Sequence, residues 1–123
     1  MELARCTVAF AIATALLGCS TTSEAPELSF QEATQRIDHS DPYEAEVRPE
    51  LGKWMIGGIM GCNLPKDQSL SLVVAIGADG RPDAVYVDPV TPATRCVQRH
   101  ILWKARLPRP PFAPFFTTPA KPF

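Results

Sequence analysis

The segment SLSLVVAIGADGRPDAVYVDP, residues 69–89, constrains the fold of this chain more than any other. Its first half alternates large apolar residues with smaller ones, and the alternation returns at Val85 and Val87. A period of two is typical of β-strands, whose side chains point to the two faces of a sheet in turn. Between the two runs, Asp79-Gly80 supplies residues that tolerate the positive φ of a tight turn. The segment therefore predicts a β-hairpin.

Helical patterns lie on both sides of this hairpin. Residues 43–63 keep apolar side chains at helical spacing, and Pro49 either starts this helix or bends it. After the hairpin, Thr91 and Pro92 are the residue types of an N-cap and a first helical position. The sequence therefore predicts one long helix before the hairpin and one helix after it.

Two shorter elements are expected at the ends of the domain. Ser29 and Glu32 have capping-box spacing, which predicts a short helix over residues 29–37. The last 16 residues hold six prolines, which lack the backbone N–H that a central strand needs. Only FFTT, residues 115–118, is predicted there as a strand. Together these elements indicate a small single α+β domain, residues 29–123, in which helices precede a β-hairpin, a helix and a short C-terminal edge strand.

The N-terminal run TVAFAIATALLG, residues 7–18, is uncharged and largely apolar. It is shorter than the roughly 20 residues that span a bilayer core, but it has the length of a signal-peptide apolar core. The LLGC that ends at Cys19 resembles the lipobox of bacterial lipoprotein precursors. This resemblance implies that residues 1–18 are removed as a signal peptide, that Cys19 is lipidated, and that residues 19–28 form a tether. Because Ser20 rather than an aspartate follows the cysteine, the family's sorting rule implies an outer-membrane anchor facing the periplasm.

Two cysteines remain once the N-terminal ones are assigned. Of the four in the chain, Cys6 belongs to the signal peptide and Cys19 is the lipidation residue. Cys62 and Cys96 form an even pair in an oxidising compartment, which predicts a disulfide. The alternative is a metal site, because Cys96 and His100 are four residues apart on a helix and Cys62 would add a third ligand. A structural zinc site normally has four ligands, so the disulfide is favoured and no cofactor is expected.

The charged residues are unevenly distributed along the chain. Eight acidic residues and two arginines lie between Glu24 and Glu50, whereas no acidic residue follows Asp88. The last part carries six basic residues: Arg95, Arg99, Lys104, Arg106, Arg109 and Lys121. Either these groups are solvated or face the acidic half, or they form a basic face toward anionic lipid or an acidic partner. Nucleic acid is not expected as a partner in the periplasm.

The second half of the chain resembles a known type of domain. The hairpin VVAIGADGRPDAVYV and the helix end WKARLP are similar to the C-terminal domain of TonB-type proteins. With a cysteine in each helix, the stretch RCVQRHILWKARLP and the terminal PF are more similar still to the AgmX/PglI-type periplasmic module. The resemblance covers residues 45–123 and implies a structural, non-catalytic module. A TonB energy transducer needs an inner-membrane helix and a long spacer, so energy transduction is not implied for this chain.

No motif in the chain indicates catalysis. No serine occurs in a G-x-S-x-G context. Asp38, His39 and Asp41 lie together in a polar segment that reads as a solvated loop. No catalytic residue is therefore predicted, and the chain is not expected to be an enzyme.

The expected function is that of an outer-membrane-anchored periplasmic lipoprotein that serves an envelope assembly as a non-catalytic protein-interaction module. Phe112, Phe115 and Phe116 are candidate anchors for an unidentified protein partner that adds a strand to the sheet edge. Alternatively, these phenylalanines cover the domain's own sheet. A second interpretation of the whole chain is a lipid-anchored inhibitor or immunity protein that neutralises a periplasmic toxin or hydrolase.

Overall fold

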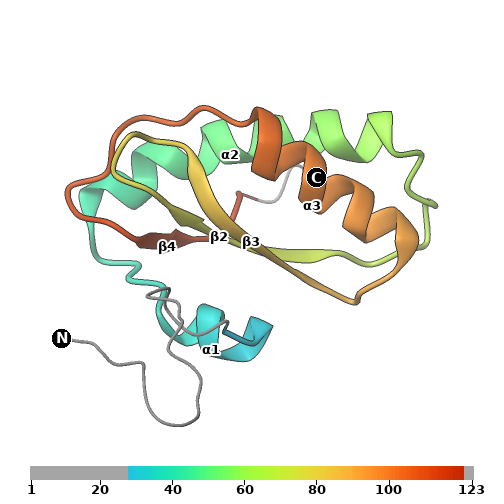
Figure 1. Cartoon of the computed structure of the whole chain (residues 1–123), viewed down its shortest axis with the longest axis horizontal. Helices are drawn as coiled ribbons and strands as arrows, with labels where there is room; N and C mark the ends of the chain where they lie inside the picture. Colours follow the sequence, from blue (N-terminus) through green and yellow to red (C-terminus); the bar gives the residue numbers. More distant parts are fainter. Residues whose placement is uncertain (1–27, 121–123) are drawn as a thin grey trace, which may run out of the picture.

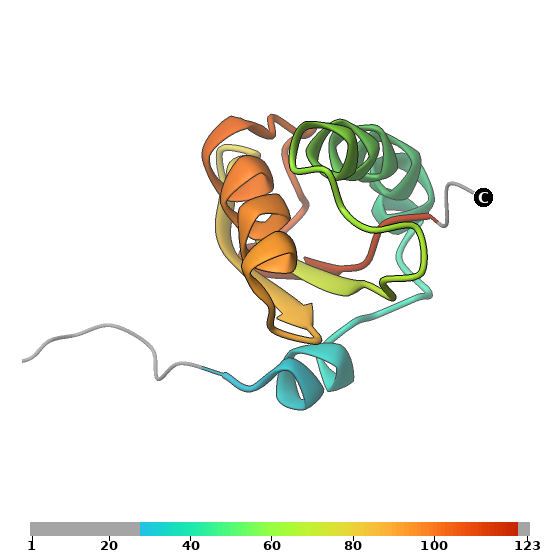
Figure 2. The ribbon, with the colours of Figure 1, turned by 90° about the vertical axis from the view of Figure 1, so that its right-hand side faces the viewer.

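The computed structural model describes residues 28–120, so the predicted signal peptide, Cys19 and nearly all of the predicted tether lie outside the described residues. Along the described chain the elements are α1 (Phe30–Gln35), α2 (Pro42–Gly61), β2 (Ser71–Ile76), β3 (Pro82–Asp88), α3 (Pro92–Lys104) and β4 (Phe115–Thr117) (Figure 1). The strands form an antiparallel sheet in the order β3-β2-β4. Figure 2 shows α2 and α3 side by side over one face of this sheet and α1 on the other side. The structure confirms the predicted small α+β domain with its hairpin.

The hairpin forms where the alternating pattern predicts it. Leu72 pairs with Val87 and Val74 with Val85, which places these four side chains on the face covered by α2 and α3. The turn closes through a hydrogen bond from Gly77 N to the Arg81 carbonyl at 2.8 Å. The predicted period of two therefore sets the register of β2 and β3.

Both faces of the central strand are buried. Val73 and Ala75 point to the face opposite the long helices, where they form a second apolar cluster with Ala33 of α1 and Phe116 of β4. This second layer explains why five consecutive residues of β2 are buried rather than every second one. The short helix α1 is therefore part of the core and not an appendage of the tether.

The helices begin at the residues whose side chains can cap them. Ser29 and Glu32 make both hydrogen bonds of a capping box at the start of α1. The Asp41 carboxylate accepts a hydrogen bond from Tyr43 N at 2.8 Å, and α2 begins at Pro42. Pro49 lies inside α2 and does not start it. The predicted N-cap Thr91 is likewise confirmed for α3.

The glycines of α2 allow α3 to approach closely at one position. A Cβ added to Gly58 would lie 3.2 Å from both Val97 Cγ1 and His100 Cδ2. Gly61, in contrast, has no atom within 4 Å of such a Cβ. α3 therefore approaches α2 closely at Gly58, where side chains of α3 rather than its backbone make the contact.

The segment after α3 crosses the hairpin turn before it returns as β4. Leu107 N donates a hydrogen bond to the Gly80 carbonyl at 3.1 Å, and the Tyr43 hydroxyl donates to the Pro108 carbonyl. Burial raises the pKa of Tyr43 to about 12, which reinforces the protonated form that a tyrosine already has at neutral pH and that donates this hydrogen bond. The strand predicted in FFTT is confirmed at residues 115–117, where it pairs with β2 at the edge of the sheet.

Candidate functional site

The acidic loop before α2 is accounted for by local structure. Asp38 Oδ1 accepts hydrogen bonds from the Ser40 hydroxyl at 2.6 Å and from Ser40 N at 2.9 Å. These hydrogen bonds hold the pKa of Asp38 below its ordinary value. Asp41 caps α2, as described above. The two carboxylates thus shape the loop and the helix end.

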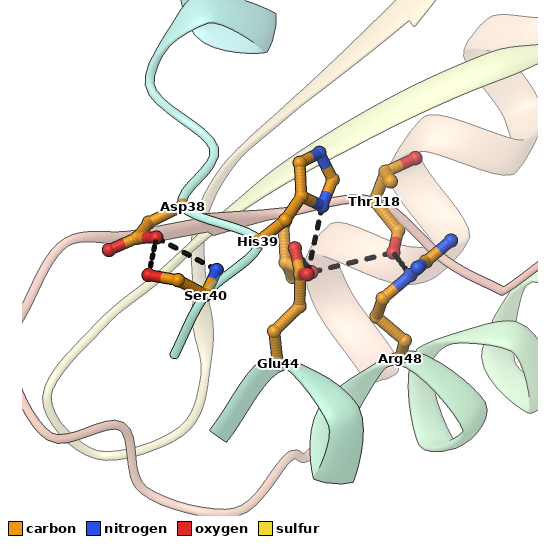
Figure 3. A network of polar contacts seen from close by, with 7 residues as sticks. Asp38, His39, Ser40, Glu44, Arg48 and Thr118 are labelled. Atoms are coloured by element: carbon orange, nitrogen blue, oxygen red, sulfur yellow. Dashed lines mark hydrogen bonds and ion pairs between the residues drawn. The ribbon is translucent and has the colours of Figure 1, made fainter. Parts of the chain in front are cut away.

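A buried carboxylate lies next to this loop. Glu44, which is only 4% exposed, has its Oε1 at 2.8 Å from His39 Nδ1 and its Oε2 at 3.5 Å from Thr117 Oγ1 of β4. Figure 3 shows Arg48 and Thr118 beside this pair, joined by a hydrogen bond of 3.1 Å from Arg48 Nε to the Thr118 carbonyl. These contacts fasten the C-terminal strand to the first turns of α2.

Sequence reasoning did not identify Glu44 as a buried residue. A signal was present, because Asp41 and Glu44 have the spacing of an N-cap and the third helical residue. In the structure the Glu44 side chain turns to His39 and Thr117 instead of capping the helix. The spacing therefore indicated that the Glu44 side chain would make a local hydrogen bond, but it did not indicate His39 and Thr117 as the partners.

Cys62 and Cys96 are joined to one another. Their Sγ atoms are 2.07 Å apart and their Cα atoms 5.8 Å apart, the separation of a disulfide. The bond links the end of α2 to the first turns of α3. The His100 ring lies against Gly57 and Gly58 of α2. Within residues 28–120, no three His, Cys, Asp or Glu side chains lie close enough together to hold a metal ion. Cys62 and Cys96 form a disulfide and not the metal site considered as the alternative.

The phenylalanines proposed as partner anchors do not form one surface. Phe115 is 1% exposed and Phe116 is 8% exposed, because they point to the two buried faces of the sheet. Phe115 also packs edge-on against Tyr43, with ring centroids 4.8 Å apart. These two residues therefore cannot serve as exposed anchors, and the alternative that they cover the domain's own sheet is correct. Phe112 remains 54% exposed beside Phe115.

The groove that the structure reveals instead follows β3. Ten residues line it: Phe30, Asp83, Ala84, Val85, Tyr86, Val87, Val90, Arg95, Gln98 and Leu102. They come from α1, from β3 and the loop after it, and from α3, so the floor of the groove is the edge strand itself. Its lining is mainly apolar, and its charged members are Asp83 and Arg95.

The edge of β3 is partly occupied by a side chain of α3. Gln98 Nε2 donates a hydrogen bond of 2.6 Å to the Val85 carbonyl. Bonded and non-bonded pairs alternate along an antiparallel ladder. Because the Val85 carbonyl turns outward to Gln98, the backbone groups of Val87 also turn away from β2. β3 thus presents strand-pairing groups toward the groove.

Neither the helices of the described chain nor its comparison with known proteins adds a further candidate site. Among residues 28–120, no helix has both the length and the hydrophobicity required to cross a bilayer. Comparison with protein-family models, curated proteins and solved structures finds no match for the chain.

Proposed function

We propose that the protein is a lipid-anchored, non-catalytic interaction module of the bacterial envelope, and that it binds an extended segment of a partner protein along β3. The observation that carries this proposal is the groove whose floor is the outer edge of β3. A segment laid in that groove would add a strand to the sheet, and main-chain hydrogen bonds would then supply affinity.

β3 is better suited to this role than the opposite edge. It is seven residues long, whereas β4 has three residues and lies between Pro114 and Pro119. Proline has no N–H to donate, so a strand added to β4 would find few partners. The longer edge therefore offers the more extensive pairing surface.

The lining of the groove limits the sequence that it can accept. Phe30 from α1 and Leu102 from α3 border β3, so successive side chains of an added strand would meet apolar surface on either side. Arg95 lies one turn before Gln98 on α3 and forms no ion pair within residues 28–120. The partner segment is expected to carry alternating apolar residues and an acidic residue that meets Arg95.

A photoreactive amino acid in place of Gln98 tests the proposal in cells that make the protein. We expect one main crosslinked adduct in the native envelope, and a strong reduction of that adduct when Arg95→Glu is added. The measurement is mass spectrometry of the crosslinked peptide, which should show an extended, partly acidic segment.

The matched control places the same photoreactive residue at Arg109, which is exposed in the loop after α3. Equal labelling from both positions, or an adduct that is insensitive to Arg95→Glu, would contradict binding in the groove. A hydrolase or toxin that loses activity in the adduct would identify the module as an inhibitor.

The lipid anchor is tested by fractionation. Cys19→Ser is expected to move the protein from the membrane fraction, washed in high salt, to the soluble fraction, because acyl chains supply about 0.8 kcal/mol per buried CH₂. Immunoblotting of the two fractions measures the shift. Cys6→Ser is the control and should stay with the membrane. A Cys19→Ser protein that remains in the washed pellet would rule out lipidation as the anchor.

A further inference from the structure

The outer surface of the two long helices carries apolar side chains that do not belong to the core. α2 and α3 lie side by side over the sheet, and their outward surface faces away from it (Figure 2). Ile56 and Met60 of α2 are 39% and 73% exposed, and Trp103 of α3 is 67% exposed. We call this surface the helical face and define it by seven residues: Lys53, Ile56, Gly57, Met60, Arg99, Trp103 and Lys104.

The charge of the helical face is predominantly positive. Neither α3 nor the part of α2 from Lys53 to Gly61 contains an acidic residue. Arg99 and Lys104 are exposed and form no ion pair within residues 28–120. Lys53 pairs with Glu50 at 3.3 Å, and Glu46 lies one turn earlier, so acidic residues border the face at its end toward the start of α2.

The form of this surface indicates which partner fits it. Ile56 and Met60 lie one turn apart on α2 and Trp103 lies on the adjacent α3, whereas the groove described above lies on the β3 side of the domain. A protein partner usually anchors side chains in pockets at the centre of its interface. An anionic bilayer requires no pocket, because tryptophan and long basic side chains insert at the level of the headgroups.

We infer that the helical face lies against an anionic membrane surface. Trp103, Met60 and Ile56 would reach the boundary between headgroups and acyl chains, while Arg99 and Lys104 would meet lipid phosphates. This contact does not depend on peptide binding, since the groove along β3 opens beside the helical layer and would stay accessible. It would fix the orientation of the domain on the membrane.

Trp103 provides a direct reporter of this contact. The chain has two tryptophans, so Trp54→Phe in the full chain leaves Trp103 as the single one. Vesicles of equal parts phosphatidylglycerol and phosphatidylcholine with brominated acyl chains are expected to quench Trp103 and to shift its emission to shorter wavelength. Vesicles of phosphatidylcholine alone should leave its emission unchanged.

Charge reversal on the same face is the second arm of the experiment. The double variant Arg99→Glu/Lys104→Glu changes two exposed residues, and it should weaken vesicle binding measured through Trp103 by roughly tenfold or more. The matched control is Arg109→Glu in the loop after α3, which should have little effect. Circular dichroism would show that each variant keeps its fold.

Three results would overturn the inference. The first is a chain that floats with the anionic vesicles while Trp103 is not quenched, since another segment would then make the contact. The second is equal quenching by neutral vesicles. The third is a Trp103 shift with soluble polyglutamate but not with vesicles, which would assign the face to an acidic protein.

Discussion

Replacement of Gly80 by valine is expected to lower the melting temperature of the domain by roughly 15 °C or to prevent folding. Gly80 has φ +88°, a conformation that costs about 1–2 kcal/mol for a residue with a side chain. A Cβ at this position would also lie 2.1 Å from the Leu107 carbonyl oxygen, and this oxygen belongs to backbone that is itself held by Gly80. Thermal unfolding followed by circular dichroism measures the change.

Two further glycine variants test whether the Cβ atom, rather than the branched valine side chain, causes the loss of stability at Gly80. Gly80→Ala should be nearly as damaging as Gly80→Val, because the Cβ itself makes the close contact. Gly61→Ala should be neutral or should stabilise the domain by up to about 1 kcal/mol, since its Cβ meets no atom and alanine favours the helix. A Gly80→Ala protein as stable as the parent would show that the turn and the segment after α3 are not arranged as described.

Removal of the Cys62–Cys96 disulfide is expected to lower the melting temperature by a similar amount. The double variant Cys62→Ser/Cys96→Ser opens a loop with a sequence separation of 34 residues. The resulting gain in unfolded-state entropy corresponds to about 4 kcal/mol. For a domain of this size, that is a fall in melting temperature on the order of 15 °C or more. The measurement is the melting temperature of the oxidised parent and of the variant.

Reducing agent provides the control for this comparison. It should bring the parent protein to the melting temperature of the double variant and leave the variant itself unchanged. A chelator should affect neither protein. Cys62 and Cys96 thiols that react with an alkylating agent before reduction would contradict the disulfide.

Local sequence patterns predicted the elements of the fold well. The alternation on either side of Asp79-Gly80 gave the hairpin, and Ser29 with Glu32 gave the cap of α1. These features depend on residues close together in the chain, where turn and capping chemistry acts directly. The pairing of Cys62 with Cys96 was predictable for another reason, since assigning the N-terminal cysteines left only one pair.

The candidate site was much less predictable. The sequence does not show whether Phe115 and Phe116 are exposed anchors or core residues. They are buried because β4 pairs with β2, which is a contact between distant segments. The groove along β3 also depends on distant elements, because α1 supplies Phe30 and α3 supplies Gln98. No local spacing connects those residues, so the groove emerges only from tertiary packing.

The attachment of residues 118–120 to α2 has a consequence for how the chain folds. Thr118 hydrogen-bonds to Leu72 across 46 positions of sequence and to Arg48 across 70. Ala120 N donates to the Arg48 carbonyl. Such distant contacts form only after a long loop has closed. The fold therefore cannot be completed until almost the entire chain is free to pair, so a partly synthesised chain cannot reach this structure.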